Sequence, residues 1–339
     1  MTKARAKTVG IYLLKLVGTV AFLWWALSQI PDKGALLRNF QTALRSPFWI
    51  AVGLSLSCSA IFAGALRWHI LLKAQEIHVS YWYVVRLTLY GSLFNLVSIG
   101  AAAGDAAKIL CLIRNRPDRK VQITLSLMLD HLVGFIATCI IFLVFAWGFQ
   151  TVENARDLSG RGVFFTATLF QAGGLFFVAL NFWLCSPRMM RFCERKFPKF
   201  AAREWVQSTT RSIDVFRARW KHSLAALAAS IVLSLAFFLT FYAALRSLGQ
   251  NTPAAEVLSV MPIVDVVASL PISISGLGVR ERTFDFLLNQ LTGTPTGMAV
   301  AASLIGFVFH SFWGLIGGLA FITEPTRKKI TTLLIEDED

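Results

Sequence analysis

The chain has 339 residues, of which 55% are hydrophobic and only 15% are charged, and its formal net charge is +14. Soluble domains carry about 25% charged residues, so this composition, with a mean hydropathy of +0.61, excludes an ordinary soluble protein and indicates an integral membrane protein. The excess Lys and Arg residues lie between apolar runs and form no RNA-binding motif, which argues against nucleic acid as a partner and favours a role in membrane orientation.

Six apolar stretches are long enough to cross a bilayer, which takes about 20 residues of α-helix. The first of them follows a basic N-terminus and is too long for the apolar part of a signal peptide, so we expect it to be retained. Segment 33–46 is short and mixed in character, as is typical of an interfacial helix. The six expected spans are 9–30, 47–72, 121–149, 163–185, 222–248 and 297–322.

Two further apolar regions, 81–113 and 254–291, are each interrupted near the middle by polar, glycine-rich sequence. Basic residues gather at the N-terminus, in 108–120 and in 186–221, so these segments and both termini are expected on the cytoplasmic side. With six full crossings, the first interrupted region enters from the cytoplasm and returns, and the second enters from the outside and returns. The alternative is that both regions cross completely, which gives eight spans with kinked helices.

The interrupted regions occupy corresponding places in two halves, about 1–149 and 163–322, of a single transmembrane domain. Sliding the sequence by 174 residues sets Leu96 on Leu270, Gly104 on Gly278 and Lys108 on Arg282. The predicted fold is therefore an all-α inverted-repeat helical bundle with two re-entrant broken-helix hairpins.

Two further segments have a distinctive composition. Segment 186–221 mixes aromatic and basic residues, which predicts either amphipathic helices on the inner leaflet or a basic loop that fixes topology. The tail 330–339 ends in acidic residues and is expected to be disordered.

The second interruption reads PISISGLGVRE (271–281) and places charge where hydrocarbon is the expected solvent. Gly276 and Gly278 allow the backbone to turn and to open a helix, whose N-terminus favours an anion. Arg280 lies in the first turn of that helix, where its planar guanidinium can hold a phosphate through two hydrogen bonds. We therefore expect an anion-binding site at this hairpin.

Three charged residues follow in the same helix. Glu281 points about 100° away from Arg280 and is expected to face a different neighbour. Arg282 and Asp285 stand three residues apart and are placed to pair with each other.

The first interruption, GAAAGDAAK (100–108), repeats this pattern with small residues, one acid and one base. Asp105 follows Gly104 and is read either as an ordinary N-cap or as a binding carboxylate, and Lys108 lies one turn further on. The two interruptions together predict hairpin tips of opposite charge.

Four more ionisable residues, Asp130, His131, Asp265 and His310, lie inside the expected membrane segments. An unpaired carboxylate costs a few kcal/mol at the centre of a bilayer, so we expect Asp130 to meet a cation, with Arg280 as the leading candidate. His131 and His310 are read either as hydrogen-bonded core residues or as proton-relay groups.

Four motifs occur in order along the chain and are similar to those of a known family: ALRWHILL (65–72), FNLVSIGAAAGDAAK (94–108), LMLDH (127–131) and PISISGLGVRE (271–281). Together they resemble the flippase-like membrane domain shared by lysylphosphatidylglycerol synthase/flippase proteins and their stand-alone relatives. The resemblance covers essentially the whole chain, with GLGVRE as its most specific motif.

The resemblance implies a polytopic helical domain that moves a phospholipid or related amphiphile between leaflets. It also implies a binding role for Arg280 and Glu281, and for Gly104 and Asp105 with Lys108 in the place of the family's usual base. His131 stands where an arginine is typical, and His310 lies roughly where the last span commonly carries another. These departures suggest a different or less anionic lipid, with pH-sensitive binding.

We therefore expect a lipid flippase of a bacterial cytoplasmic membrane, with membrane phospholipids as partners and a homo-oligomer left open. The expected substrate-binding residues are Gly104, Asp105, Lys108, Asp130, Gly276, Gly278, Arg280 and Glu281, with His131, Asp265, Arg282 and His310 as secondary candidates.

No catalytic residue, cofactor or metal is expected, because the chain lacks ATP-binding, serine-hydrolase and zinc-protease motifs, and its five cysteines are scattered. Two alternatives stay open: an enzyme acting on a lipid-linked substrate, with Asp105, Asp130 or Glu281 as acid or base, and a scaffold for lipid-synthesis enzymes.

Overall fold

The computed structural model describes Trp24, residues 33–97, 102–148, 158–184 and 187–196, isolated positions between 206 and 218, and residues 219–270 and 273–322. Within these ranges the chain forms helices and turns and no strand, so the all-α prediction is confirmed. The α-helices are α2 (Lys33–Leu44), α3 (Pro47–Ala74), α4 (Tyr81–Val97), α5 (Ala102–Asn115), α6 (Lys120–Phe142), α7 (Leu158–Leu184), α8 (Pro187–Lys196), α11 (Trp220–Ser247), α12 (Ala254–Ser269), α13 (Val279–Thr292) and α14 (Thr296–Ile322). Short 3-10 helices lie at η1 (Pro117–Arg119) and η3 (Ile274–Gly276), and a π-helix at η2 (Leu143–Gly148) continues α6.

Four described helices are long and apolar enough to cross a membrane, and they match four of the six expected spans. They cover Pro47–Ala74, Pro117–Gly148, Trp220–Ser247 and Gly297–Leu319. The expected span 163–185 lies almost entirely within α7, a continuous helix whose large apolar side chains are largely exposed, as suits a lipid-facing surface. The expected span 9–30 lies outside the described residues apart from Trp24, and so do the tail 330–339 and much of 186–221.

Helices α3 to α6 and helices α11 to α14 repeat one pattern. The first member of each set has 28 residues, the second 17 or 16, the third 14, and the fourth is again long. Trp220 stands 173 positions after Pro47 and Ala254 stands 173 positions after Tyr81, close to the offset of 174 that the sequence predicts.

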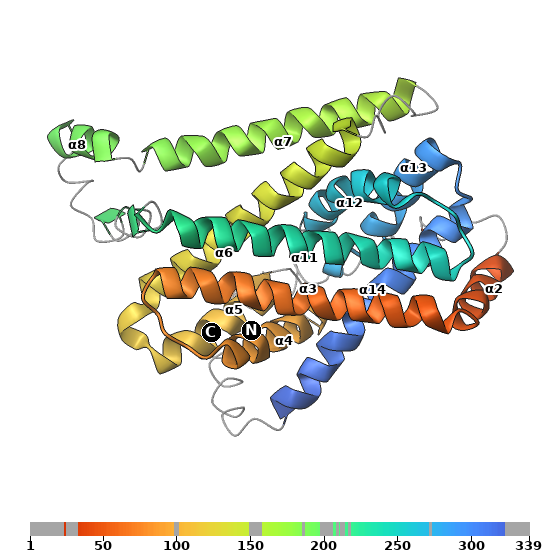
Figure 1. Ribbon diagram of the computed structural model, residues 1–339, viewed down its shortest axis with the longest axis horizontal. Coiled ribbons are helices and arrows are strands. Elements are labelled where there is room, and N and C mark those ends of the chain that lie inside the picture. The colour runs from red at the N-terminus through yellow and green to blue at the C-terminus, as the bar shows by residue number, and fades with distance from the viewer. Residues whose placement is uncertain are drawn as a thin grey trace, which may run out of the picture.

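The leading helices of the two sets, α3 and α11, pack side by side and antiparallel (Figure 1). At one end, Arg219 Nη1 donates a hydrogen bond of 3.0 Å to the Ala74 carbonyl. At the other end, the rings of Trp49 and Tyr242 lie 5.9 Å apart. Because the two helices run in opposite directions, the elements that follow them start from opposite ends of the molecule.

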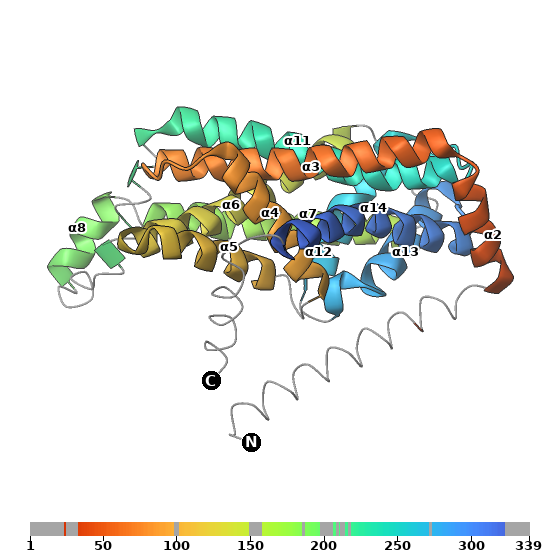
Figure 2. The same cartoon turned by 90° about the horizontal axis from the view of Figure 1, so that it is seen from below.

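Each leading helix is followed by a pair of short helices that fold back on each other, α4 with α5 and α12 with α13. We call them the first and the second hairpin; with α6 and α14 they form a layer beneath α3 and α11 (Figure 2). The tips of the hairpins meet, since Ser275 Oγ donates a hydrogen bond of 2.8 Å to the Asn95 carbonyl. Residues 98–101 and 271–272 lie outside the described ranges.

None of the four hairpin helices reaches the length that a full crossing requires. They have 14 to 17 residues, against about 20 for a spanning helix. The short helices of each pair pack against each other, and their re-entrant placement in the bilayer stays a prediction.

Apolar packing also divides between the two halves. One buried cluster joins α3, α4, α5 and α6 around Trp68 and Leu112. A larger cluster joins α11 to α14 around Phe241 and Phe284, with contributions from α6 and α7. The apolar clusters thus follow the two halves, and helix packing joins the halves, because α3 lies against α11 and α4 lies against α14 as well as against α3.

Candidate functional site

A cavity of about 350 Å³ lies where the two hairpin tips meet, and we call it the hairpin cavity. Its walls come from α3, α4, α11, α12, α13, α14 and the turn before α13. Its ionisable lining residues are Asp265, Arg280 and His310, which the sequence had marked as candidates. Apolar side chains, including Ile61, Phe237 and Phe307, complete the lining.

Arg280 presents its guanidinium to the hairpin cavity. Its Nη2 donates a hydrogen bond of 2.8 Å to the Ser275 carbonyl, and its guanidinium carbon lies 5.4 Å from the ring centroid of Phe307. These are the contacts found for this guanidinium among the described residues, so it keeps donors for a ligand. The arrangement fixes the direction of the planar fork while leaving part of it open to the cavity.

Asp265 lines the same cavity from α12. Its carboxylate and the guanidinium of Arg280 are close enough for their charges to interact, yet no ion pair within 4.0 Å joins them in the described part of the chain. The two opposite charges therefore face one cavity without neutralising each other by contact.

Three further polar groups of the lining are buried and have no hydrogen-bond partner among the described residues. They are Ser273 Oγ, His310 Nε2 and Ser311 Oγ. Buried polar atoms are nearly always satisfied in native structures. Their concentration around one cavity indicates that a polar ligand or water completes the site.

The backbone before α13 takes the turn that its glycines predict. Leu270 is extended, as expected before Pro271, and Gly276 and Gly278 have φ values of 71° and 81°. A Cβ atom on Gly276 would stand 2.8 Å from the Ala268 carbonyl, so the turn has neither the conformation nor the space for a side chain. Helix α13 then begins after Gly278, as the sequence predicts.

Glu281 is fully buried and binds within the protein. One carboxylate oxygen accepts a hydrogen bond from the Gly278 amide, which caps α13, and the other accepts one of 3.1 Å from Ser303 Oγ. Glu281 does not line the hairpin cavity, so the geometry gives it a positioning role, and its contact with substrate stays a prediction. Arg282 pairs with Asp285 at 2.8 Å, as the three-residue spacing predicts.

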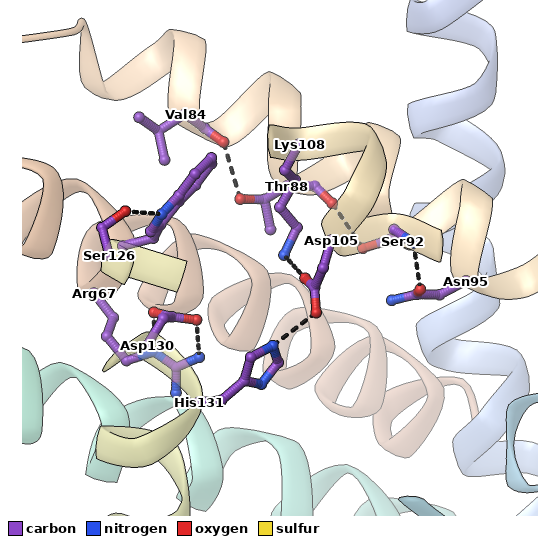
Figure 3. Close-up of polar contacts among 12 residues, drawn as sticks. Arg67, Val84, Thr88, Ser92, Asn95, Asp105, Lys108, Ser126, Asp130 and His131 are labelled. Carbon is purple, nitrogen blue, oxygen red and sulfur yellow. Dashed lines mark hydrogen bonds and ion pairs between the residues drawn. The ribbon is translucent and has the colours of Figure 1, made fainter. Parts of the chain in front are cut away.

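In the first hairpin, the Asp105 carboxylate contacts a lysine and a histidine (Figure 3). Lys108 Nζ lies 2.9 Å from Asp105 Oδ1, and His131 Nε2 lies 2.7 Å from Asp105 Oδ2. Lys108 also lies over the ring of Trp68, 5.9 Å from its centroid. The acid of this hairpin is therefore held by its own helix and by α6, and it does not reach Arg280.

Asp130 pairs with Arg67, which corrects the expected pairing with Arg280. Arg67 Nε and Nη2 each lie 2.6 Å from one carboxylate oxygen of Asp130, as in a bidentate ion pair (Figure 3). The guanidinium passes over Gly134, where a Cβ atom would stand 2.7 Å from Arg67 Nη1. Asp130 prefers Arg67 because α3 and α6 are packed together, whereas Arg280 belongs to the second hairpin.

A second cavity of about 210 Å³ adjoins the first, and we call it the ion-pair cavity. Arg67, Lys108 and Asp130 line it. Ile61, Phe237 and His310 line both cavities, so the two cavities are neighbours that share a wall.

Gly104 lies where α4 and α5 touch. Its amide donates a hydrogen bond of 2.8 Å to Asn95 Oδ1. A Cβ atom at Gly104 would lie 2.3 Å from the Gly91 carbonyl. Gly104 therefore serves close helix packing, and it does not line the hairpin cavity.

Sequence reasoning did not assign a role to Arg67, Asn95 or Ser275. Arg67 had a signal, because a cation inside an apolar span requires a partner and Asp130 was an unpaired acid in another span. Asn95 and Ser275 had none beyond their place beside the interruptions, since a hydrogen bond across 180 residues depends on how the halves dock.

The long apolar helices and the charged interior cavities define a polytopic α-helical membrane protein with a polar site between two broken-helix hairpins. Residues 12–318 match the family described as the lysylphosphatidylglycerol synthase TM region, and the chain belongs to this family. It is also similar to a protein named UPF0104 membrane protein from Pyrococcus horikoshii, at 21% identity over 330 residues, covering 91% of this chain and 95% of the relative. No solved structure matches.

Proposed function

We propose that this protein moves a phospholipid or a related amphiphilic lipid between the leaflets, and that Arg280 holds the phosphate in the hairpin cavity. The guanidinium that faces this cavity with unused donors is the observation that carries the proposal. Arginine suits phosphate because its planar fork donates two parallel hydrogen bonds. Membership in a membrane family named for a phospholipid synthase supports a lipid as cargo.

The arrangement of the hairpins supports movement across the bilayer. They start from opposite ends of the molecule, and their tips meet beside the cavity through the Ser275–Asn95 hydrogen bond. We infer that the hairpins are re-entrant and that rocking of one half against the other exposes the cavity to each leaflet in turn, as in other inverted-repeat transporters. A headgroup fits in about 350 Å³, while its acyl chains remain in the lipid.

Transport agrees with the geometry better than catalysis does. The three carboxylates that the sequence offers as acid or base are all bonded within the protein: Asp105 to Lys108 and His131, Asp130 to Arg67, and Glu281 to Gly278 and Ser303. We therefore infer that the lipid crosses chemically unchanged, and mass analysis of the lipid after incubation checks this inference.

The basic segments support a topology with both termini in the cytoplasm of a bacterium, and hence location in the inner membrane. Ten Lys and Arg residues stand against three Asp and Glu residues in 186–221, and such an excess is retained inside. Segment 150–162 balances Glu153 and Asp157 against Arg156 and Arg161, so we expect it on the outside. Membrane-impermeant labelling of single cysteines placed in 186–221 and in 150–162 checks the orientation, with labelling from outside expected in 150–162.

The test of the proposed function is lipid movement in proteoliposomes. Phospholipids with a fluorophore on the acyl chain are quenched from outside, and the fraction that becomes accessible over time reports translocation. We expect the native chain to move lipid, Arg280→Ala to be slower by about tenfold or more because a charged hydrogen bond to phosphate is lost, and Arg280→Lys to fall between them. Arg116→Ala removes an exposed arginine and serves as the matched control.

Two results would contradict the proposal. One is equal lipid movement in native and protein-free vesicles. The other is a folded Arg280→Ala variant that translocates at the native rate.

A further inference from the structure

We propose that the hairpin cavity is built for a zwitterionic headgroup, with a phosphate at Arg280 and a primary ammonium at Asp265, as in an aminophospholipid of the ethanolamine type. The inference rests on the proposed function for the source of the ligand, a membrane lipid. It adds the class of lipid and a role for Asp265.

The charges of the cavity are the first argument. Its ionisable lining side chains among the described residues are Asp265, Arg280 and His310. A ligand with one negative and one positive charge complements both the Arg280 guanidinium and the Asp265 carboxylate. An anionic headgroup without an amine would place a second negative charge beside the Asp265 carboxylate, which is unfavourable at low dielectric.

The second argument is the contrast with other acids in the protein interior. Asp130 is paired with Arg67, Asp105 with Lys108, and Asp285 with Arg282. Glu281 has no ion pair, but hydrogen bonds from Gly278 and Ser303 hold its carboxylate. The Asp265 carboxylate has neither an ion pair nor a hydrogen bond within the described residues, although Arg280 lines the same cavity. An acid left without an ion pair inside a membrane protein marks a functional position by default.

The third argument is independent of charge and comes from the unsatisfied polar atoms. Ser273 is only 5% exposed, and its hydroxyl has no partner among the described residues. Ser311 Oγ and His310 Nε2 share this state and line the same cavity. A primary ammonium donates three hydrogen bonds and a phosphate accepts several, so such a headgroup satisfies hydroxyls that the protein leaves open.

The experiment measures binding to the full-length native chain in detergent, using short-chain soluble phospholipids with ethanolamine, choline or glycerol headgroups. We expect the ethanolamine lipid to bind most tightly. Choline carries the same charge but cannot donate a hydrogen bond to Asp265, and glycerol carries no positive charge. Free phosphoethanolamine is the fourth ligand, and markedly weaker binding of it than of the lipid identifies the lipid as the source.

Asp265→Asn should weaken binding of the ethanolamine lipid about tenfold, because a charge-assisted hydrogen bond is lost, while binding of the glycerol lipid is unchanged or tighter. Asp265→Glu keeps the charge and should retain the preference. Asp118→Asn, which neutralises an exposed acid, is the matched control and should behave as the native chain. Arg280→Ala should weaken all three lipids.

Tighter binding of the glycerol lipid than of the ethanolamine lipid by the native chain would overturn the proposal, and this comparison needs no variant to fold. An unchanged ratio between these lipids in folded Asp265→Asn would also overturn it. Selective binding of the ethanolamine lipid without translocation would contradict the transport function and support the headgroup proposal. Translocation without any preference among headgroups would support the transport function and contradict the headgroup proposal.

Discussion

The two hairpins share one architecture but use their charged residues differently. In the first hairpin, Asp105 is bonded to Lys108 and His131, and the neighbouring Asp130 is bonded to Arg67. In the second, Arg280 and Asp265 face one cavity and do not pair with each other.

Charged residues at a helix interruption inside the membrane therefore do not by themselves identify a binding site, because they can pair within the protein. Asp105 of the first hairpin joins α5 to α6 through His131, and the neighbouring Arg67–Asp130 pair joins α3 to α6. In the second hairpin, Arg282 pairs with Asp285 and Glu281 caps α13. Arg280 and Asp265 instead face the hairpin cavity and form no ion pair with each other.

The largest effect on stability is expected at the ion pair between Arg67 and Asp130. Arg67→Met leaves the Asp130 carboxylate, 6% exposed, without its cation, so we expect the free energy of unfolding to fall by about 3–5 kcal/mol. The double variant Arg67→Met/Asp130→Leu removes both charges and should recover most of that loss. Thermal unfolding in detergent measures both.

Arg280→Met is the contrasting variant in the second hairpin. Since Arg280 has no ion pair with Asp265, we expect a much smaller loss of stability than for Arg67→Met. Equal losses of unfolding free energy in Arg67→Met and Arg280→Met would contradict this difference between the two sites. So would an Arg67→Met/Asp130→Leu variant that is no more stable than Arg67→Met.

A smaller effect is expected at the contact between α4 and α5. Gly104→Ala places a methyl group within 2.3 Å of the Gly91 carbonyl, and overpacking of this kind costs about 1–3 kcal/mol. Gly173→Ala, in α7, is the matched control because nothing lies within 4 Å of its added methyl group, and it should be neutral or slightly stabilising. If Gly104→Ala proved as stable as Gly173→Ala, the close approach of α4 and α5 would be refuted.

The smallest effect is expected at the link between the hairpin tips. Ser275→Ala removes the hydrogen bond to the Asn95 carbonyl and should cost about 1 kcal/mol. Amide exchange near Asn95 should become faster, because the tip of the first hairpin loses its contact with the second. Ser59→Ala is the control, since among the described residues its hydroxyl bonds to Ser55 within α3. The same change in exchange in both variants would argue against a link between the tips.

Much of the fold follows from local sequence. The four long apolar helices and the two interrupted regions stand at the predicted positions, and the repeat offset near 174 agrees with the helix starts. The start of α13 after Gly278 and the pairing of Arg282 with Asp285 were also predicted, because they involve residues within one turn of each other.

The candidate site was predicted less completely. The cavity contains Arg280, Asp265 and His310 as expected candidates, but Glu281, predicted to bind substrate, caps its own helix. A glutamate three residues after the residue that opens a helix is the capping-box signal, and it pointed to this role. Asp130 was assigned the wrong cation, since the sequence contains several and does not say which is near.

The sequence by itself determined that the protein is an all-α membrane protein, where its helices break, and which residues carry charge at those breaks. These properties depend on hydrophobic length and on Gly and Pro, which act within a few residues. Only the tertiary structure decided which charges neutralise each other and which face a cavity. Arg67 and Asp130 stand 63 residues apart and Ser275 and Asn95 stand 180 apart, so these contacts depend on how α3 packs on α6 and on how the two halves dock.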